Sequence, residues 1–168
     1  ETEKYPVVDF SYPETSLFTR FYTQYSSAEG IAYLSRVMQN STPFRAFLFA
    51  ELDRLEAPRW LVYLPVIESG YTAGAVSRSG AVGVWQFMRN SVGGYNIRMN
   101  EWFDERRDPW ISTTAAIKKI RDNYNDLGDW PLALAAYNCG LGATRRAIKQ
   151  AGTRDYWELC KRGFFRRE

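Results

Sequence analysis

Apolar side chains recur every three or four residues along most of the chain, which is the period of an amphipathic helix. Three of these stretches begin at a helix-start signal: a capping box formed by Ser26 and Glu29, the pair Thr42-Pro43, and the pair Asp108-Pro109. The apolar positions behind these signals are Ile31, Leu34, Val37 and Met38, then Phe44, Phe47, Leu48, Leu52 and Leu55, and then Ile117, Ile120, Tyr124 and Leu127. The pattern predicts a helix at each place, the last one long and closed by Gly128.

Further helices are indicated between and after these stretches. Residues 60–68 are apolar nearly all round, which predicts a core helix opened by Pro58 and bent at Pro65. A helix is also expected from Val84 to Gly93. Towards the end of the chain, helices are expected at 130–137, 143–150 and 155–162.

Two stretches lack the helical period. Residues 69–83 are rich in Gly and Ser, which is typical of a loop or a short hairpin. In residues 1–25 the aromatic side chains show no clean period, so we expect an extended arm, although a helix beginning near Ser16 fits as well. The fold class expected is mainly α with a central glycine-rich loop or short hairpin, in which residues 26–168 form one domain after the arm.

The composition limits which catalytic groups, metal sites and partners the chain can have. The chain has 168 residues, a net charge of +3, two Cys and no His. Lack of His excludes Ser-His and Cys-His catalysis and His-ligated zinc, so acid–base work falls to Asp, Glu, Tyr, Lys or Cys. The charge is too small to indicate nucleic acid as a partner. No stretch is long and apolar enough to predict a membrane span.

Glu68 is the first candidate for chemistry. It ends the apolar run 61–67, and no Lys or Arg lies between Trp60 and Tyr71 to pair with it. Burial without a counter-charge raises the pKa of a carboxyl group and makes it a proton donor near neutral pH. The alternative is an exposed or capping Glu at a helix end.

Two other segments carry polar groups in suggestive places. Ser77 lies in the Gly/Ser loop, and Gln86 stands between Trp85 and Phe87, whose rings could be either platforms for sugar rings or core anchors. Tyr137 and Asn138 follow two small residues at a helix end. They could supply hydrogen bonds, or be a buried ring and a helix C-cap.

Taken together, the segments resemble a known family. Residues 64–69 (Leu-Pro-Val-Ile-Glu-Ser), Ser77 with Gly80-Ala81, residues 83–88 (Gly-Val-Trp-Gln-Phe-Met) and residues 136–140 (Ala-Tyr-Asn-Cys-Gly) resemble, in order, the soluble lytic transglycosylase domain. This lysozyme-like family cuts bacterial peptidoglycan. Residues 104–109 look like the segment that precedes a long helix in the membrane-bound D-type members of this family. The resemblance covers about residues 55–150, and Cys139 departs from it where a small residue such as Ala is usual.

The resemblance implies a fold of the goose-type lysozyme kind and a substrate, the glycan strand, cut between N-acetylmuramic acid and N-acetylglucosamine. Glu68 would act as acid and then as base, leaving a 1,6-anhydro end. Ser77, Gln86, Met88, Tyr137 and Asn138 would bind the substrate or support Glu68, with Tyr137 bonded to it. No metal or cofactor is expected. The matched motifs carry one carboxylate, whereas ordinary glycosidases use two.

Two other functions fit the same residues. A goose-type lysozyme would hydrolyse the bond with water held by Asp104 or Glu101, and a non-catalytic module would only bind peptidoglycan. The resemblance places the protein in the bacterial cell envelope, periplasmic or associated with the outer membrane, and a monomer is expected. In an oxidising compartment Cys139 and Cys160 can pair or stay reduced, and both states remain open.

Overall fold

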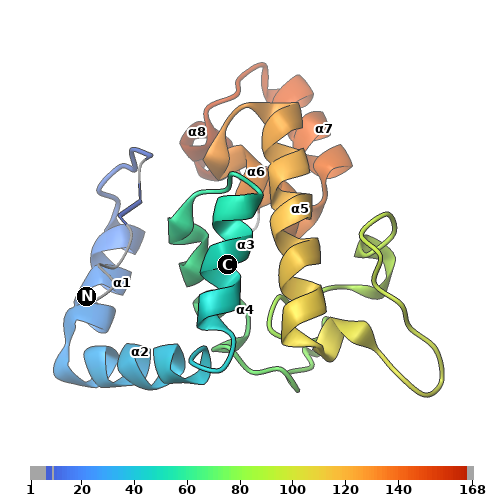
Figure 1. Cartoon of the computed structure of the whole chain (residues 1–168). Coiled ribbons are helices and arrows are strands. Elements are labelled where there is room, and N and C mark those ends of the chain that lie inside the picture. Colours follow the sequence, from blue (N-terminus) through green and yellow to red (C-terminus); the bar gives the residue numbers. More distant parts are fainter. Residues whose placement is uncertain (1–6, 9, 166–168) are drawn as a thin grey trace. The chain divides into compact units, whose positions relative to one another are not determined.

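The computed structural model describes residues 7–8 and 10–165, and it is built from helices joined by one long irregular segment (Figure 1). The α-helices are α1 (Ser16–Ser26), α2 (Ala28–Asn40), α3 (Arg45–Arg54), α4 (Leu64–Ser69), α5 (Pro109–Leu127), α6 (Trp130–Cys139), α7 (Leu141–Ala151) and α8 (Tyr156–Lys161). Three 3₁₀ helices are η1 (Arg59–Tyr63), η2 (Arg89–Ser91) and η3 (Glu105–Arg107). In the described part of the chain β pairing is limited to isolated bridges, so the mainly α class is confirmed.

The described chain forms two compact units. One contains Thr15–Lys118 and the other contains residues 119–165, so the long helix α5 contributes to both. The division of the sequence at residue 25 into an arm and a domain stays a prediction.

The segment expected to be an extended arm is helical from Ser16 onward, so the arm is wrong for residues 16–25 and the alternative, a helix beginning near Ser16, is confirmed. Residues 1–6 and 9 of the expected arm lie outside the described residues. The Thr15 side chain caps α1 by accepting a hydrogen bond from the Phe18 N–H at 3.1 Å. The aromatic rings pair four residues apart along this helix, with 5.9 Å between the centroids of Phe18 and Tyr22. Such pairs stabilise a helix although they leave no ordinary apolar stripe.

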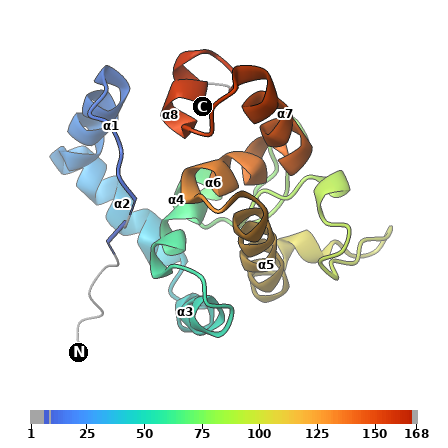
Figure 2. The same cartoon turned by 90° about the horizontal axis from the view of Figure 1, so that it is seen from above.

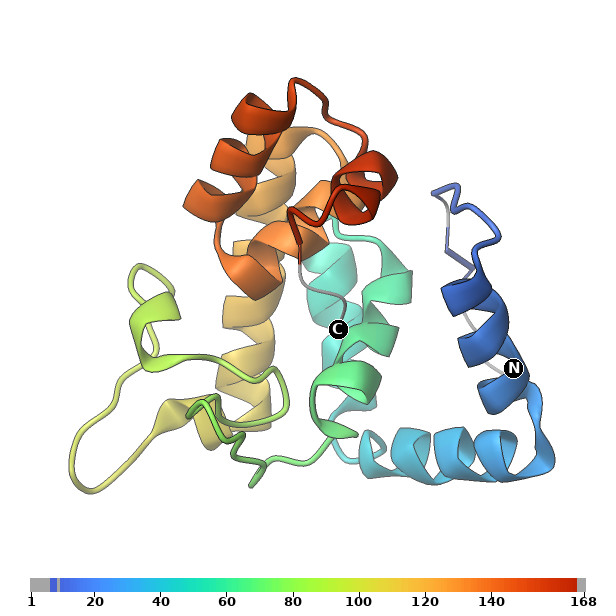
Figure 3. The same ribbon diagram turned by 180° about the vertical axis from the view of Figure 1, so that it is seen from behind.

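Two predicted helix starts shift by a few residues. Ser27, and not Ser26, is the N-cap of α2, and its hydroxyl accepts from the Gly30 N–H at 3.0 Å; α1 and α2 meet there at a corner (Figure 3). The pair Thr42-Pro43 lies in a turn ahead of α3, which begins at Arg45 without a side-chain cap. The hydroxyl of Ser41 accepts a 2.8 Å hydrogen bond from the Arg45 side chain and ties this turn to α3.

The apolar segment before Glu68 forms two short helices instead of one. η1 buries Leu61 and Val62 completely, and α4 follows directly. Pro65 lies in the first turn of α4, where its missing N–H costs no hydrogen bond. The expected bend is therefore a change of helix type at this proline.

Residues 70–108 of the first unit contain no α-helix, so the helix expected from Val84 is wrong. Val82 and Phe87 instead exchange backbone hydrogen bonds of 3.1 and 3.0 Å and close a tight turn between them. The indole N–H of Trp85 donates to the Thr113 hydroxyl on α5 at 2.8 Å, and Trp85 is fully buried. A contact across 28 residues thus holds this segment in a turn.

The second unit gathers α6, α7 and α8 with the end of α5 (Figure 2). Its core is a cluster of small and branched side chains: Leu127, Leu132, Ala136, Ala147 and Leu159. The amide of Asn123 donates to the Ala133 carbonyl at 3.2 Å, and the rings of Tyr124 and Trp130 stack with centroids 3.9 Å apart. The predicted helices of this region are confirmed.

Candidate active site

Glu68 lies one residue before the end of α4, and its side chain is half-buried. Its neighbour Ser69 donates a 2.8 Å hydrogen bond from its hydroxyl to the carbonyl oxygen of Val84. The same hydroxyl accepts from the Thr72 N–H at 3.2 Å. The end of the helix that carries Glu68 is thereby joined to the turn that carries Gln86.

That turn depends on Gly83. Its φ is +83°, and a Cβ added there would lie 1.9 Å from the Arg106 carbonyl oxygen. Only glycine fits such an approach. The Gln86 side chain is half-buried, and its amide nitrogen donates to the Gly83 carbonyl at 2.9 Å. Gln86 also has a positive φ of 49°, which is uncommon for a residue with a side chain.

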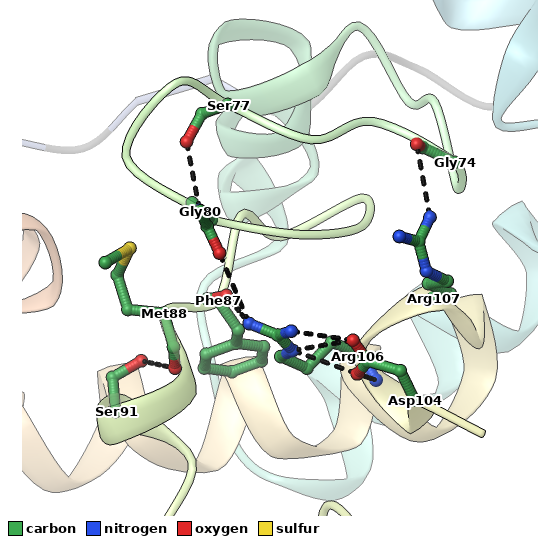
Figure 4. A network of polar contacts seen from close by, with 10 residues as sticks. Gly74, Ser77, Gly80, Phe87, Met88, Ser91, Asp104, Arg106 and Arg107 are labelled. Atoms are coloured by element: carbon green, nitrogen blue, oxygen red, sulfur yellow. Dashed lines mark hydrogen bonds and ion pairs between the residues drawn. The ribbon is translucent and has the colours of Figure 1, made fainter. Parts of the chain in front are cut away.

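The two aromatic neighbours of Gln86 are core anchors. Trp85 is fully buried and Phe87 is 2% exposed, so neither ring offers a platform for a sugar. Met88, by contrast, is 37% exposed. In Figure 4 its side chain points away from the ring of Phe87. Of the two residues that follow Gln86 in the matched motif, the exposed one is therefore the methionine.

Ser77 closes the neighbouring loop. Its hydroxyl accepts from the Ala81 N–H at 3.0 Å and lies 3.0 Å from the Ser79 hydroxyl. Its carbonyl accepts from the Gly80 N–H, also at 3.0 Å (Figure 4). The side chain is half-buried. In this structure Ser77 holds the loop in shape, and its proposed contact with substrate stays a prediction.

A buried ion pair supports both loops. The Arg106 guanidinium, in a residue only 8% exposed, donates to the Phe87 carbonyl at 3.0 Å and to the Gly80 carbonyl at 3.4 Å (Figure 4). Its Nε also donates to both carboxylate oxygens of Asp104, at 2.9 and 3.2 Å, and its Nη2 donates to Oδ2 at 2.6 Å. These hydrogen bonds from Arg106 hold the pKa of the Asp104 carboxyl below its usual value. Asp104 is thus the counter-ion of a structural arginine.

Nothing in the sequence singles out Arg106. No feature of the spacing distinguishes it from Arg107, which is exposed and reaches the Gly74 carbonyl at 3.4 Å. The difference arises because Arg106 faces the carbonyl groups of a loop 19 to 26 residues earlier in the chain.

Tyr137 and Asn138 belong to the other unit, on the last turn of α6. Tyr137 is half-buried, and Asn138 is exposed. The C-cap of α6 is Gly140, with a φ of +90°, so the alternative role of Asn138 as the cap is wrong. A hydrogen bond between Tyr137 and Glu68 stays a prediction.

The two cysteines are also in this unit, and neither forms a disulfide. The Cys139 sulfur lies 3.4 Å from the hydroxyl of Thr144. Within residues 7–8 and 10–165, no cluster of three or more His, Cys, Asp or Glu side chains is arranged to hold a metal ion. Over the same residues, no helix is long and apolar enough to cross a membrane.

The motif residues described above all lie within the region that matches a family model. Residues 45–160 match the model of the transglycosylase SLT domain. Membrane-bound lytic murein transglycosylase D from Escherichia coli K12 and the protein of the same name from E. coli O6:H1 (strain CFT073) are each 35% identical to the chain over 133 residues. Each alignment covers 76% of this chain but only 29% of the relative. The chain belongs to the transglycosylase SLT domain family.

Proposed function

We propose that the chain is the catalytic domain of a peptidoglycan lytic transglycosylase, with Glu68 as its acid and base. The observation that carries the proposal is the hydrogen bond from Ser69 to Val84, because it joins the helix end bearing Glu68 to the Gly83–Gln86 turn of the matched motif. Family membership and the name of the two relatives support the reaction class.

The reaction needs one carboxyl group that works twice. Glu68 donates its proton to the glycosidic oxygen as the bond to the anomeric carbon of N-acetylmuramic acid breaks. The resulting carboxylate accepts the proton of the C6 hydroxyl, whose oxygen attacks the anomeric carbon and closes a 1,6-anhydro ring. The proton balance of Glu68 is restored, and no water is consumed. The N-acetyl group of the substrate stabilises the developing positive charge.

The other predicted site residues take supporting roles in this proposal. Ser77, Gln86 and Met88 contact the sugars, Tyr137 holds the Glu68 carboxyl by a hydrogen bond, and Asn138 supports the end of α6. One N–H of the Gln86 amide donates to the Gly83 carbonyl, so its second N–H and its carboxamide oxygen are the groups offered to substrate hydroxyls.

The arrangement of Asp104 supports internal attack over hydrolysis. A hydrolase of the goose-type lysozyme kind needs a carboxylate that positions water. Asp104, one of the two candidates, directs both of its oxygens to Arg106. The other candidate, Glu101, is exposed on a loop. We therefore expect the C6 hydroxyl to be the acceptor.

The substrate and the location follow from the same proposal. Glycan strands of peptidoglycan are the partner, the protein acts as a monomer, and its place is the cell envelope, periplasmic or associated with the outer membrane. The two relatives are named membrane-bound, which supports the envelope.

The mass spectrum of products from purified glycan strands tests the reaction. The expected products are 1,6-anhydromuramyl species, lighter by one water than hydrolysis products. A substrate whose muramic acid C6 hydroxyl is blocked should not be cut. Reducing muramic acid ends would instead show a goose-type muramidase. Binding to sacculi without any turnover would show a non-catalytic module.

A further inference from the structure

Trp102 is the most exposed large apolar side chain in the described part of the chain, at 89%. A single exposed apolar residue is common on protein surfaces and proves nothing alone. The surroundings of Trp102 are unusual because its backbone is tightly held. An exposed indole on an ordered backbone can bind a ligand without any further ordering of that backbone.

The turn around Trp102 is closed by Asn100. The side-chain oxygen of Asn100 accepts hydrogen bonds from the N–H groups of Trp102 and Phe103, at 2.8 and 2.9 Å. The Asn100 N–H donates to the Phe103 carbonyl at 2.9 Å, and Met99 pairs with Asp104 in an isolated antiparallel bridge. The backbone that carries the indole therefore has little freedom left.

The base of the turn is an ion pair. The buried carboxylate of Glu105 accepts from the backbone N–H and from the Nε of Arg98, both at 2.8 Å, and the Glu105 N–H donates to the Arg98 carbonyl at 3.0 Å. The Arg98 guanidinium also lies 5.6 Å from the centroid of the Phe103 ring. Trp102 thus projects from a segment that is held by the Asn100 hydrogen bonds in the turn and by the Arg98–Glu105 ion pair at its base.

This segment continues directly into the support of the candidate active site. Asp104, two residues after Trp102, pairs with Arg106, and Arg106 holds the carbonyl groups of Gly80 and Phe87. The turn with Trp102 and the loop with Gln86 are therefore braced by one ion pair within one unit.

We propose that Trp102 is a stacking platform for a sugar ring of the glycan strand, outside the pair of sugars that reacts. This inference rests on the proposed function. The substrate is a polymer and extends beyond the reacting bond. One face of a pyranose ring presents C–H groups, which pack on the electron-rich face of an indole while the hydroxyls stay in water. Because the backbone is already ordered, binding costs little further entropy.

The charges around Trp102 favour a sugar over an anionic membrane surface. Binding to anionic lipid requires a cluster of unpaired Lys or Arg. Arg98, the cationic residue at the start of the turn, is paired with Glu105, and Trp102 follows directly after the acidic Glu101. A weakly charged, hydroxyl-rich ligand suits these neighbours better.

Binding to purified sacculi by the full chain tests the proposal, in a Glu68→Gln background that prevents turnover. Trp102→Ala should weaken binding about tenfold, which is typical for loss of a tryptophan anchor. Its melting temperature should not change, because the side chain is exposed. Trp102→Tyr should bind with intermediate strength. Trp157→Ala, which removes an exposed tryptophan of the other unit, is the matched control and should bind as the parent does.

Unchanged binding by Trp102→Ala would overturn the proposal. Adsorption to vesicles of anionic phospholipid is measured in parallel. If Trp102→Ala weakens this adsorption but leaves sacculus binding unchanged, Trp102 is a membrane contact and the proposal is overturned. With Glu68 intact, Trp102→Ala should raise KM for long strands and leave kcat unchanged. If anhydro products are absent but Trp102→Ala still weakens sacculus binding, the proposed reaction fails and the sugar platform stands.

Discussion

The hydroxyl of Ser69 and the carbonyl oxygen of Val84 are joined by a 2.8 Å hydrogen bond across 15 residues of sequence. Ser69 follows Glu68, and Val84 precedes Trp85, whose indole is anchored to Thr113 on α5. The position of the candidate acid is therefore tied through one hydroxyl to a fully buried tryptophan. A substitution that disturbs the Gly83–Phe87 turn should therefore also displace Glu68.

Glu68→Gln should lower the rate of glycan cleavage at least about 100-fold, because Gln can neither give nor take the proton. The fold should survive, since the shape is kept. The rate is measured on purified glycan strands and the fold by thermal unfolding. Glu29→Gln, an exposed change on α2, is the control and should leave the rate unaltered. Turnover by Glu68→Gln near the wild-type rate would remove Glu68 from the mechanism.

Tyr137→Phe should lower the rate more than the stability. The ring still packs in the half-buried site, but the hydroxyl proposed to hold Glu68 is lost. Tyr124→Phe, which keeps the ring stacked on Trp130, is the matched control in the same unit. If Tyr137→Phe changes only the melting temperature, the role of Tyr137 is structural.

Asp104→Asn should cost about 3 kcal/mol of unfolding free energy, because it leaves the buried Arg106 guanidinium without its counter-charge. The products should still be 1,6-anhydro species. Asp126→Asn breaks the exposed pair with Arg145 and should cost less than about 1 kcal/mol. Denaturant unfolding and product mass measure the two effects. A stable but inactive Asp104→Asn with hydrolytic wild-type products would indicate a lysozyme.

The same pair predicts a dependence of stability on acid. The pKa of Asp104 is lowered in the folded protein by the hydrogen bonds from Arg106. The stabilisation is therefore fully present above the pKa of the unfolded chain and is lost as the pH falls through the folded pKa. Unfolding free energy measured from neutral pH down to below the ordinary Asp value of 3.8 should fall less in Asp104→Asn than in wild type. Equal slopes would contradict the role of this pair.

Gly83→Ala and Gly80→Ala separate backbone strain from a steric clash. Both glycines have positive φ, of +83° and +86°. A Cβ at Gly80 meets no atom within 4 Å, so this change should cost only about 1–2 kcal/mol of strain. A Cβ at Gly83 lies 1.9 Å from the Arg106 carbonyl, so the turn must open, with a much larger loss of stability and of rate. Similar melting temperatures for the two variants would contradict this packing.

Local signals explain the elements that were predicted well. Asp108 and Pro109 begin α5, Gly128 ends it, and the Asp129 side chain caps α6 through the Leu132 N–H at 2.9 Å. These signals act within four residues, so the sequence is sufficient to place them. The motif order from residue 64 to residue 140 is also a property of the sequence alone, and it determined the family and the candidate acid Glu68 without the structure.

Other features depend on partners far along the chain. Residues from Val84 onward have an apolar pattern that suits a helix. They form a turn instead, because Trp85 donates a hydrogen bond to Thr113 and Arg106 donates one to the Phe87 carbonyl. Whether Trp85 and Phe87 are platforms for sugar rings or core anchors was likewise decided by tertiary burial, because both rings are enclosed in the folded chain. Composition and spacing carry no information about which side chain meets a distant carbonyl, because that choice arises only when the chain packs.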